Sequence, residues 1–378
     1  MTPQSRLIVV KVGTSSLTNE DGSLNVEEMG RLVDQVAEAV RAGNRMIIVT
    51  SGAIASGVAE LGIRPKPRDI IAQQVAAAAG QAILMAHYRE LFKPHGLRVA
   101  QVLLTQDDLS NRTSYVHVCN VLDTLLQLGV VPIINENDVT SIDEIIPVME
   151  GYRVNFSDND VLSALIANAT EADLLVVLSD VDGLYTKNPE EPGAELIPVV
   201  EEVTSELKQM AEGKGRLGRG GMKTKLQAAE IVTSSGVPMV IANSQRENVL
   251  GDILAGRPVG TLFKPTERMP SRKRWIAYGA SVRGQIVVNE GAKRAMGRGA
   301  SLLPIGVVGV SGSFDVGDVV SLTDQGDVEF ARGIANYTSE EANLIKGVKT
   351  DRIEAILGYV RRKELVTRKY AVLWEERA

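Results

Sequence analysis

The sequence predicts an α/β protein in which a mainly parallel sheet is sandwiched by helices and followed by a small, mostly β domain. Three observations support this: short β-branched runs alternate with helical patterns, those runs are continuously apolar, and the pattern changes near residue 264. Alternation of strands and helices favours a parallel sheet covered on both faces, because parallel strands need long crossover connections. In such sheets, ligands bind beyond the carboxyl ends of the strands.

Six short apolar runs are expected to form the buried strands of the first domain. They are Leu7–Val12, Met46–Thr50, Arg98–Leu104, Val130–Ile134, Leu174–Leu178 and Pro238–Ala242. The clearest helix pattern covers Val26–Ala42, with Asn25 as its expected N-cap and Gly43 just after its end. Further helices are expected at Ile70–Phe92, Val116–Leu128, Val161–Asn168, Thr224–Ser234 and Glu247–Leu254.

The segment KPTERMPSRKR (264–274) holds two prolines and five basic residues, which is typical of a linker. Beyond it, short strands separated by glycines are expected at Gln285–Asn289, Gly306–Val310, Asp318–Ser321 and Val328–Ala331, with a helix at Ser339–Lys346. The predicted domains are therefore residues 1–263, a linker at 264–274, and residues 275–378.

Composition narrows the class of protein. The chain has 378 residues, enough for two domains, and its 41 basic and 47 acidic side chains suit a soluble metabolic protein better than a nucleic-acid binder. The single cysteine, Cys119, cannot form an intrachain disulfide, which favours a reducing compartment such as the cytoplasm. The first apolar run lacks a basic n-region and no stretch approaches 18 apolar residues, so neither a signal peptide nor a membrane span is expected.

A glycine-rich segment, GRGGMKTK (218–225), precedes an amphipathic helix and carries two lysines. Exposed backbone N–H groups, the positive end of a helix and lysine charge together suit a polyphosphate. The segment is not the common P-loop, G-x-x-x-x-G-K-[ST], because Gly221 and Met222 stand where that pattern needs Lys and Ser or Thr. A flexible surface loop is the alternative interpretation.

Four further motifs follow expected strands. They are Lys11-Val-Gly-Thr14, Thr50-Ser-Gly-Ala53, Asn135-Glu-Asn-Asp138 and Ser179-Asp-Val-Asp-Gly183. Because the ends of parallel strands share one edge of the sheet, these motifs should converge. Lys11 ends an apolar strand and must reach a charge or water; with Gly13 and Thr14 after it, a phosphate-directed lysine is favoured over one that reaches a surface carboxylate.

Two other motifs allow a structural and a functional interpretation. Ser51 and Gly52 either hold an anion at a helix start or only form a tight turn. In Asp158-Asn159-Asp160, helix capping explains one acidic residue, whereas a cluster aimed at an amine, Mg²⁺ or lysines explains all three residues. The three histidines, His87, His95 and His117, lack metal-ligand spacing with Cys119 and are interpreted as structural.

The sequence shows neither a Ser-His-Asp nor a Cys-His pattern, and this points to a particular chemistry. An acceptor carboxylate is already ionised at pH 7, since its reference pKa is about 4.3. Its phosphorylation therefore needs no general base, but it needs lysines, Mg²⁺ and N–H groups that bring two anions together. Lysines, carboxylates and glycines without histidine fit this reaction better than hydrolysis or hydride transfer.

Taken in order, six segments resemble the amino-acid kinase family, and most closely its members that phosphorylate glutamate. The segments are VVKVGTSSLT (9–18), IVTSGAIASG (48–57), VPIINENDV (131–139), SDNDVLSALIA (157–167), LSDVDGLYT (178–186) and GRGGMKTKLQAA (218–229). The segment ARGIANYTSEEANLIKG (331–347) resembles the C-terminal PUA domain that many bacterial members carry. The resemblance covers nearly the whole chain.

The resemblance implies transfer of the γ-phosphoryl group of ATP to the side-chain carboxylate of L-glutamate, the first step of proline biosynthesis. It also implies Mg²⁺ bound mainly through the ATP phosphates with no metal-ligating side chain, feedback inhibition by proline, and a homodimer or homotetramer. Lys11 and Lys225 would stabilise the transferring group, and Asp160 would orient both lysines. Glutamate would be bound by Ser51, Gly52, Asn135, Asp138, Asp158 and Asn159. ATP would be bound by Lys11, Gly13, Ser179, Asp180, Arg219, Gly220, Gly221, Met222, Lys223, Thr224 and Lys225.

Some residues depart from the family pattern. The segment 142–156 is longer than the family usually has, Ser157 stands where Gly is expected, and Arg219 and Lys223 replace small polar residues. A kinase of the same fold that phosphorylates a different carboxylate or phosphate acceptor therefore stays open. A second alternative is RNA binding through residues 275–378. Their 14 basic and 13 acidic side chains give a net charge of only +1, which provides little electrostatic attraction for RNA.

Overall fold

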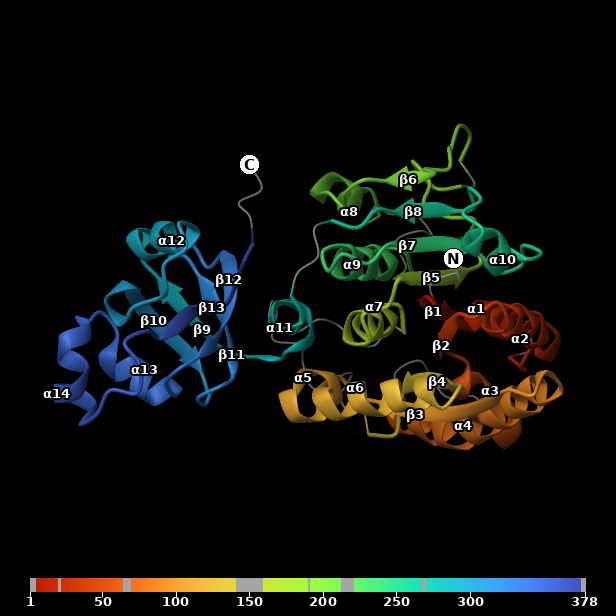
Figure 1. Ribbon diagram of the computed structural model, residues 1–378, viewed down its shortest axis with the longest axis horizontal. Coiled ribbons are helices and arrows are strands. Elements are labelled where there is room, and N and C mark those ends of the chain that lie inside the picture. The colour runs from red at the N-terminus through yellow and green to blue at the C-terminus, as the bar shows by residue number, and fades with distance from the viewer. Residues whose placement is uncertain are drawn as a thin grey trace. The chain divides into compact units, whose positions relative to one another are not determined.

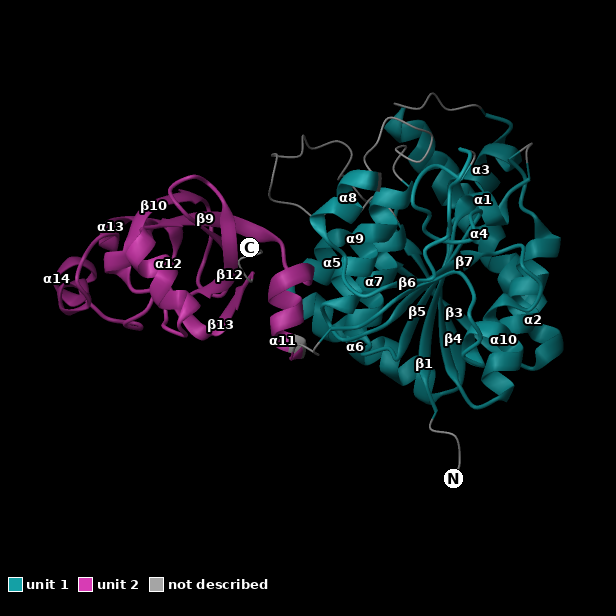
Figure 2. Cartoon of the chain, turned by 90° about the horizontal axis from the view of Figure 1, so that it is seen from above, with its two compact units in different colours: residues 1–147, 155–269 teal, residues 148–154, 270–378 magenta. Residues whose placement is uncertain are grey.

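The computed structural model describes residues 5–19, 22–63, 69–140, 159–189, 191–211, 221–266 and 270–374. These residues divide into two compact units, one ending at residue 266 and the other beginning at residue 270 (Figures 1 and 2). Each unit has its own hydrophobic core and its own sheet.

The first unit is built on an eight-stranded sheet with the order β3-β4-β2-β1-β5-β7-β8-β6. The strands are β1 (Leu7–Val12), β2 (Arg45–Val49), β3 (Arg98–Leu104), β4 (Val130–Glu136), β5 (Leu174–Ser179), β6 (Val199–Val200), β7 (Met239–Asn243) and β8 (Thr261–Phe263). Neighbouring strands are parallel except for the antiparallel pair β7–β8. The predicted mainly parallel sheet is therefore confirmed.

Helices cover both faces of this sheet, with α2 and α10 on one side and α6, α7 and α9 on the other (Figure 2). The helices are α1 (Thr14–Leu17), α2 (Val26–Arg41), α3 (Ala53–Leu61), α4 (Ile70–Phe92), α5 (Gln106–Ser110), α6 (Arg112–Gln127), α7 (Asn159–Ala169), α8 (Ser205–Ala211), α9 (Gly221–Thr233) and α10 (Val249–Leu254). The predicted cap of α2 is confirmed, because the Asn25 side chain accepts a hydrogen bond from the Glu28 N–H.

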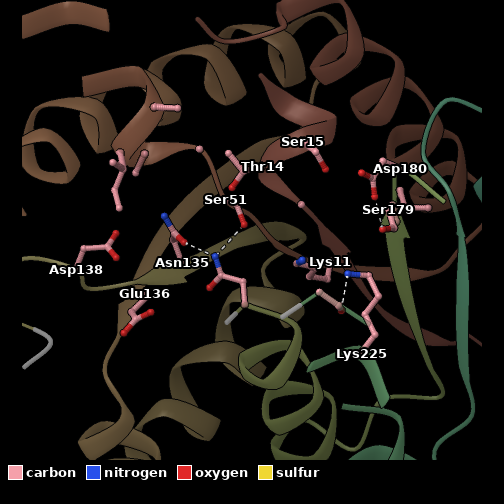
Figure 3. Close-up of a pocket in the computed structure, with 18 residues that line it drawn as sticks. Lys11, Thr14, Ser15, Ser51, Asn135, Glu136, Asp138, Ser179, Asp180 and Lys225 are labelled. Atoms are coloured by element: carbon pink, nitrogen blue, oxygen red, sulfur yellow. Dashed lines mark hydrogen bonds between the residues drawn. The ribbon is translucent and has the colours of Figure 1, made fainter. Parts of the chain in front are cut away.

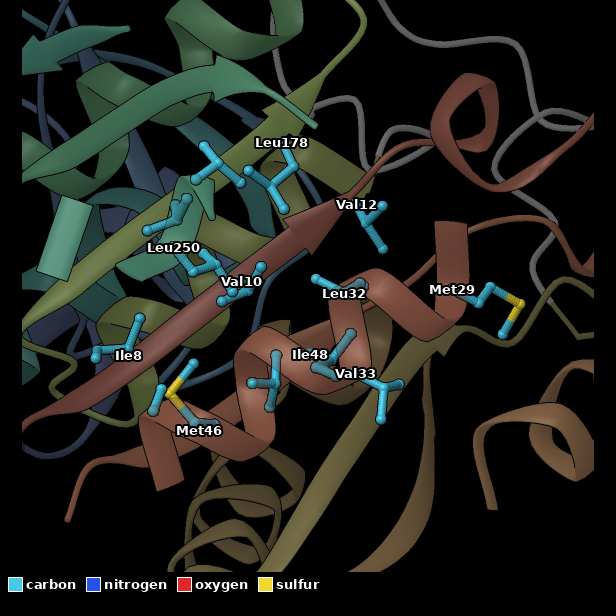
Figure 4. Close-up of a cluster of buried hydrophobic side chains, with 14 of the residues drawn as sticks. Ile8, Val10, Val12, Met29, Leu32, Val33, Met46, Ile48, Leu178 and Leu250 are labelled. Carbon is cyan, nitrogen blue, oxygen red and sulfur yellow. The ribbon is translucent and has the colours of Figure 1, made fainter. Parts of the chain in front are cut away.

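The alternation of side chains along β1 sets the direction of Lys11. Ile8, Val10 and Val12 lie on one face of the strand and pack into the core beside α2 and β2 (Figure 4). Because successive side chains in a strand point to opposite faces, Lys11 leaves the other face, the one that α7 contacts. Each fully buried aliphatic side chain stabilises this arrangement by about 1.5–3 kcal/mol, so a slip in register is disfavoured.

Among the described residues, α4 is the one helix whose length and composition would allow it to cross a membrane. In the structure it packs against α2, α3 and β3. It buries Leu84, Tyr88 and Phe92 in the core of the first unit. Its apolar composition therefore has an explanation in the packing of this unit.

The second unit contains a five-stranded sheet with the order β10-β9-β11-β12-β13, which bears out the predicted small, mostly β domain. Its strands are β9 (Val282–Val288), β10 (Val307–Gly312), β11 (Val319–Thr323), β12 (Glu329–Ala335) and β13 (Val366–Leu373), and its helices are α11 (Ser271–Arg274), α12 (Glu290–Gly297), α13 (Ser339–Ile345) and α14 (Ile353–Leu357). A π-helical turn at Trp275–Gly279 follows α11.

Several boundaries differ from the sequence-based expectations. Part of the segment expected as a linker, Ser271–Arg274, forms α11 and contacts β13 within the second unit. Helix α6 begins at Arg112, four residues earlier than expected, because the Asn111 side chain caps it by accepting from the N–H groups of Thr113 and Ser114. The long segment 142–156 lies outside the described residues.

Candidate active site

The carboxyl ends of β1, β2, β4 and β5 meet at one pocket of about 470 Å³ (Figure 3). Eleven residues expected at the site line it: Lys11, Gly13, Ser51, Gly52, Asn135, Asp138, Asn159, Ser179, Asp180, Gly221 and Lys225. The four motifs that follow strands in the sequence are thus brought to one place, as expected for a parallel sheet.

The other expected residues that the structure describes do not line the pocket. Asp160 is completely buried and pairs with two lysines that line the pocket. On α9, Met222 is buried, Lys223 is exposed, and Thr224 donates a hydrogen bond to Asp160 Oδ2 at 3.1 Å. Asp158, Arg219 and Gly220 lie outside the described residues.

Two lysines share one carboxylate at the centre of the site. The Nζ of Lys11 lies 2.6 Å from Oδ1 of Asp160, and the Nζ of Lys225 lies 3.1 Å from Oδ2. Lys225 also donates to the Gly221 carbonyl at 3.1 Å, within the first turn of α9. Since the lysines come from β1 and α9 and the carboxylate from α7, this cluster joins three elements of the fold.

Charge and burial decide how this cluster behaves. Burial by itself would raise the pKa of Asp160, but the positive charges and hydrogen bonds of Lys11 and Lys225 outweigh it and hold the pKa below its ordinary value. Asp160 is therefore ionised at neutral pH. Two cations and one anion give the cluster itself a net positive charge in a buried position, which favours an anionic group beside the two lysines.

Amide and hydroxyl groups build one end of the pocket. The Nδ2 of Asn159 lies 2.9 Å from Ser51 Oγ, 3.1 Å from Asn135 Oδ1 and 2.8 Å from the carbonyl oxygen of Thr50. Glu136 and Asp138 lie at the same end of the pocket as Asn135 (Figure 3). Polar groups together with two acidic side chains suit a ligand that carries both an ammonium group and a carboxylate.

A left-handed glycine shapes the turn at this end. Gly52 has φ +98 and ψ 1, a conformation that residues with a Cβ rarely adopt. It follows Ser51 and directly precedes α3, so the chain turns sharply at the carboxyl end of β2. The turn places Ser51 Oγ within hydrogen-bond reach of Asn159.

At the other end of the pocket lie Ser179 and Asp180, with the lysines between the two ends (Figure 3). Ser179 Oγ donates to Asp180 Oδ1 at 3.0 Å, and Asp180 is exposed. The first residue of α9, Gly221, also lines the pocket, so the positive end of a 13-residue helix faces it.

The structure adds residues that sequence reasoning missed. Thr14, Ser15 and Glu136 line the pocket, and each belongs to a motif from which only neighbouring residues were selected. Gln81 of α4 accepts a hydrogen bond of 2.9 Å from Asn135, and no motif around Gln81 in the sequence indicates a functional residue. A glutamine in an Ala-rich helix has no recognisable spacing to a strand end.

The fold and this lysine-lined pocket place the chain among kinases whose active site lies at the carboxyl edge of a parallel sheet. The sequence model of the Amino acid kinase family matches residues 6–243, and the chain belongs to that family. The model of the PUA domain matches residues 284–357, within the second unit.

Similar proteins narrow the class further. The glutamate 5-kinase of Thermoanaerobacter sp. (strain X514) is 47% identical over 372 residues, covering 97% of this chain and 98% of that protein. The glutamate 5-kinase of Moorella thermoacetica is 47% identical over 369 residues, with 97% and 95% covered. That of Geobacter sulfurreducens is 46% identical over 370 residues, with 97% of both chains covered.

Proposed function

We propose that this protein transfers the γ-phosphoryl group of ATP to the side-chain carboxylate of L-glutamate, giving L-glutamyl 5-phosphate in the first step of proline biosynthesis. The observation that carries the proposal is the Lys11–Asp160–Lys225 cluster at the centre of the pocket, between a polar acceptor end and a helix N-terminus. The similar glutamate 5-kinases support the choice of substrate.

In this reaction an oxygen of the acceptor carboxylate attacks the γ-phosphorus, and the bond from that phosphorus to the β-phosphate oxygen breaks. The carboxylate is ionised at pH 7, so no proton has to be removed. None of the described residues that line the pocket is a histidine. The main barrier is the approach of two anions, and Lys11 and Lys225 offset it by placing fixed positive charge beside the transferring group.

Each end of the pocket would bind one of the two substrates. The acceptor end, formed by Ser51, Asn135, Asp138 and Asn159, would bind glutamate, with the Asp138 carboxylate facing the α-ammonium group. Ser179, Asp180, Gly221 and Lys225 would bind ATP, whose phosphates would meet the positive end of α9. The lysine cluster between the two ends then lies where the phosphoryl group moves.

Mg²⁺ would enter this site with ATP. Among the described residues, no group of three or more His, Cys, Asp or Glu side chains could hold a metal ion. The nearby Asp160 carboxylate already pairs with two lysines. A hard cation that keeps several waters and binds phosphate oxygens therefore fits the pocket better as part of MgATP, where it would neutralise phosphate charge.

Three further properties belong to the proposal. Proline would inhibit by occupying the acceptor end, since it shares an α-carboxylate and an amino group with glutamate. The protein would act in the cytoplasm as a homodimer or homotetramer. Inhibition by proline would be tested by initial rates at varied concentrations of proline and glutamate. The oligomeric state would be tested by the mass of the purified protein in light scattering.

The direct experiment measures ADP formation from MgATP in the presence of hydroxylamine, which traps an acyl phosphate as its hydroxamate. Glutamate, aspartate, N-acetylglutamate, UMP and carbamate would be compared as acceptors. The expected result is that glutamate alone gives both ADP and hydroxamate. ADP formation with another acceptor, and none with glutamate, would overturn the proposed substrate and leave the family assignment intact.

A further inference from the structure

Helix α4 contacts Asn135, at the acceptor end of the pocket, through the side chain of Gln81. Gln81 does not line the pocket and is 8% exposed. Its Oε1 accepts a hydrogen bond of 2.9 Å from the Nδ2 of Asn135, 54 residues further along the chain. A buried amide side chain in an otherwise apolar helix face is costly unless it is hydrogen-bonded, so this contact is specific.

The hydrogen bond from Asn135 to Gln81 fixes which way the Asn135 amide faces. An amide has one accepting oxygen and one donating nitrogen. Because Nδ2 of Asn135 is bound by Gln81, its Oδ1 faces Asn159 and accepts from that residue's Nδ2 at 3.1 Å. If Gln81 offered no acceptor, the Asn135 amide would lose one of its two hydrogen bonds and would be held by Asn159 alone.

The hydrogen-bond network continues from Asn135 to Asn159, which lines the pocket and is also bound to the backbone carbonyl of Thr50. Its Nδ2 lies within hydrogen-bond distance of three acceptors: Thr50 O, Ser51 Oγ and Asn135 Oδ1. Its Oδ1 therefore faces the opposite way, and it is buried without a hydrogen-bond partner among the described residues. A buried acceptor whose direction is fixed is suited to a donor that arrives with a ligand.

The position of Gln81 depends on an unusually close contact between α3 and α4. A Cβ added to Gly80 would lie 1.8 Å from the carbonyl oxygen of Ala53, and one added to Gly57 would lie 1.7 Å from that of Ala76. The two helix backbones therefore touch, and α4 lies deep enough for Gln81, the residue after Gly80, to meet Asn135.

We infer that Gln81 is a positioning residue for the acceptor end of the pocket, acting on Asn159 through Asn135. The inference rests on the proposed function and deepens it: Gln81 governs binding of the phosphoryl acceptor and leaves ATP binding unchanged. If Gln81 had only a structural role, replacing it would change stability alone, or would change the KM values of both substrates equally.

The test uses the full-length protein and the variant Gln81→Met, which keeps the length of the side chain and removes its acceptor. The expected result is a rise of about tenfold in the KM for glutamate, the size of one lost buried hydrogen bond, with the KM for ATP within twofold of wild type. The matched control is Gln101→Met, at an exposed position of β3, with both KM values unchanged.

A double-mutant cycle with Asn135→Ala tests the route of the effect. If Gln81 acts through Asn135, Gln81→Met should raise the glutamate KM less than twofold in that background. Independent effects that multiply, or equal rises in the KM values of both substrates, would overturn the inference.

A second variant covers the case in which Gln81→Met does not fold. Gln81→Glu keeps an acceptor at Oε1 and puts an oxygen in place of Nε2, which has no partner among the described residues. At a position that is only 8% exposed, burial favours the neutral carboxyl group, so no buried charge is added. It should keep the glutamate KM within about threefold of wild type, the range expected when the hydrogen bond is retained. A tenfold or larger rise would contradict the inference. A wild-type protein without glutamate-dependent activity would instead refute the proposed function.

Discussion

Lys11 and Asp160 form a buried ion pair, with 2.6 Å between the lysine Nζ and the carboxylate Oδ1 and with 7% and 0% of the two side chains exposed. Lys225 binds the other oxygen of the same carboxylate. One anion thus holds two cations in place before any substrate arrives. Preorganised charge of this kind costs no reorganisation when the substrates react, which is how fixed charges contribute most to catalysis.

Replacing Lys225 by alanine should abolish phosphoryl transfer. The variant removes one of the two positive charges beside the transferring group, for which we expect a fall in kcat of about 100-fold or more. Asp160 keeps its pair with Lys11, so the protein should stay folded. Turnover and thermal unfolding would both be measured, with Lys93→Ala, at a 73% exposed side chain, as the control. Near-wild-type turnover would contradict the role of Lys225.

The ion-pair cluster should make stability depend on pH in the acid range. The pKa of Asp160 in the folded protein lies below its ordinary value of 3.8, because the two lysines outweigh the effect of burial. A lowered pKa means that the folded state binds fewer protons than the unfolded state. The stabilisation by Asp160 is therefore complete above pH 3.8 and is lost as the pH falls through the lower, folded-state pKa.

This pH dependence is checked by the free energy of unfolding of wild type and of Asp160→Asn from pH 7 down to pH 3. We expect Asp160→Asn to be destabilised by about 3–5 kcal/mol at pH 7, because it leaves two buried lysines without a counter-charge. The difference should stay constant down to about pH 4 and shrink below it. A constant difference over the whole range would be evidence against a lowered pKa for Asp160.

Much of the fold and of the pocket could be predicted from the sequence, because both depend on local patterns. Lys11, Ser51, Asn135 and Ser179 each follow a run of buried apolar residues, and a parallel sheet brings the ends of such runs to one edge. The lysine cluster could be expected for the same reason, since a lysine at the end of a buried strand needs a counter-charge.

Features that depend on contacts between distant segments could not be predicted. Helix α3 is short and consists mostly of small residues, and it is held against α4 by close backbone contacts at Gly57 of α3 and at Gly80 of α4. Gln81 looks like any helical glutamine until that contact places it beside Asn135. Strand β13 was missed because charged residues such as Arg368 and Lys369 interrupt its alternation. The expected sites at Asp158, Arg219 and Gly220 lie outside the described residues and stay predictions.

Replacing Asp138 by alanine should affect the two substrates differently. Of the proposed substrates, only glutamate carries an ammonium group, so loss of the Asp138 carboxylate should raise the glutamate KM by about 10- to 100-fold, the value of one charged hydrogen bond. The KM for ATP should change less than about threefold, because ATP has no ammonium group that the Asp138 carboxylate could bind. Steady-state kinetics with each substrate varied in turn would measure both, and Asp123→Ala, at an exposed position of α6, would serve as the control. Equal effects on both substrates would refute the role of Asp138 in binding the amino acid.

The glycine contact between α3 and α4 should be intolerant of a single methyl group. A Cβ on Gly80 would lie 1.8 Å from the carbonyl oxygen of Ala53 and 2.4 Å from the backbone nitrogen of Gly57, so the two helices would have to move apart. Overpacking of this kind costs about 3 kcal/mol or more where rigid backbone atoms are in the way.

Gly30→Ala is the matched control, because Gly30 lies within α2 and its added Cβ would meet only a side-chain atom of Leu91, at 3.8 Å. That variant should be stabilised by about 0.5–1 kcal/mol, since alanine has the higher helix propensity. Urea unfolding of both variants would measure the difference. Gly80→Ala should also raise the glutamate KM, because Ala53 begins the helix that follows Ser51 and Gly52. Gly80→Ala with the stability of the wild type would show that α3 moves away from α4 without cost, and the close contact would then not hold Gln81 in place.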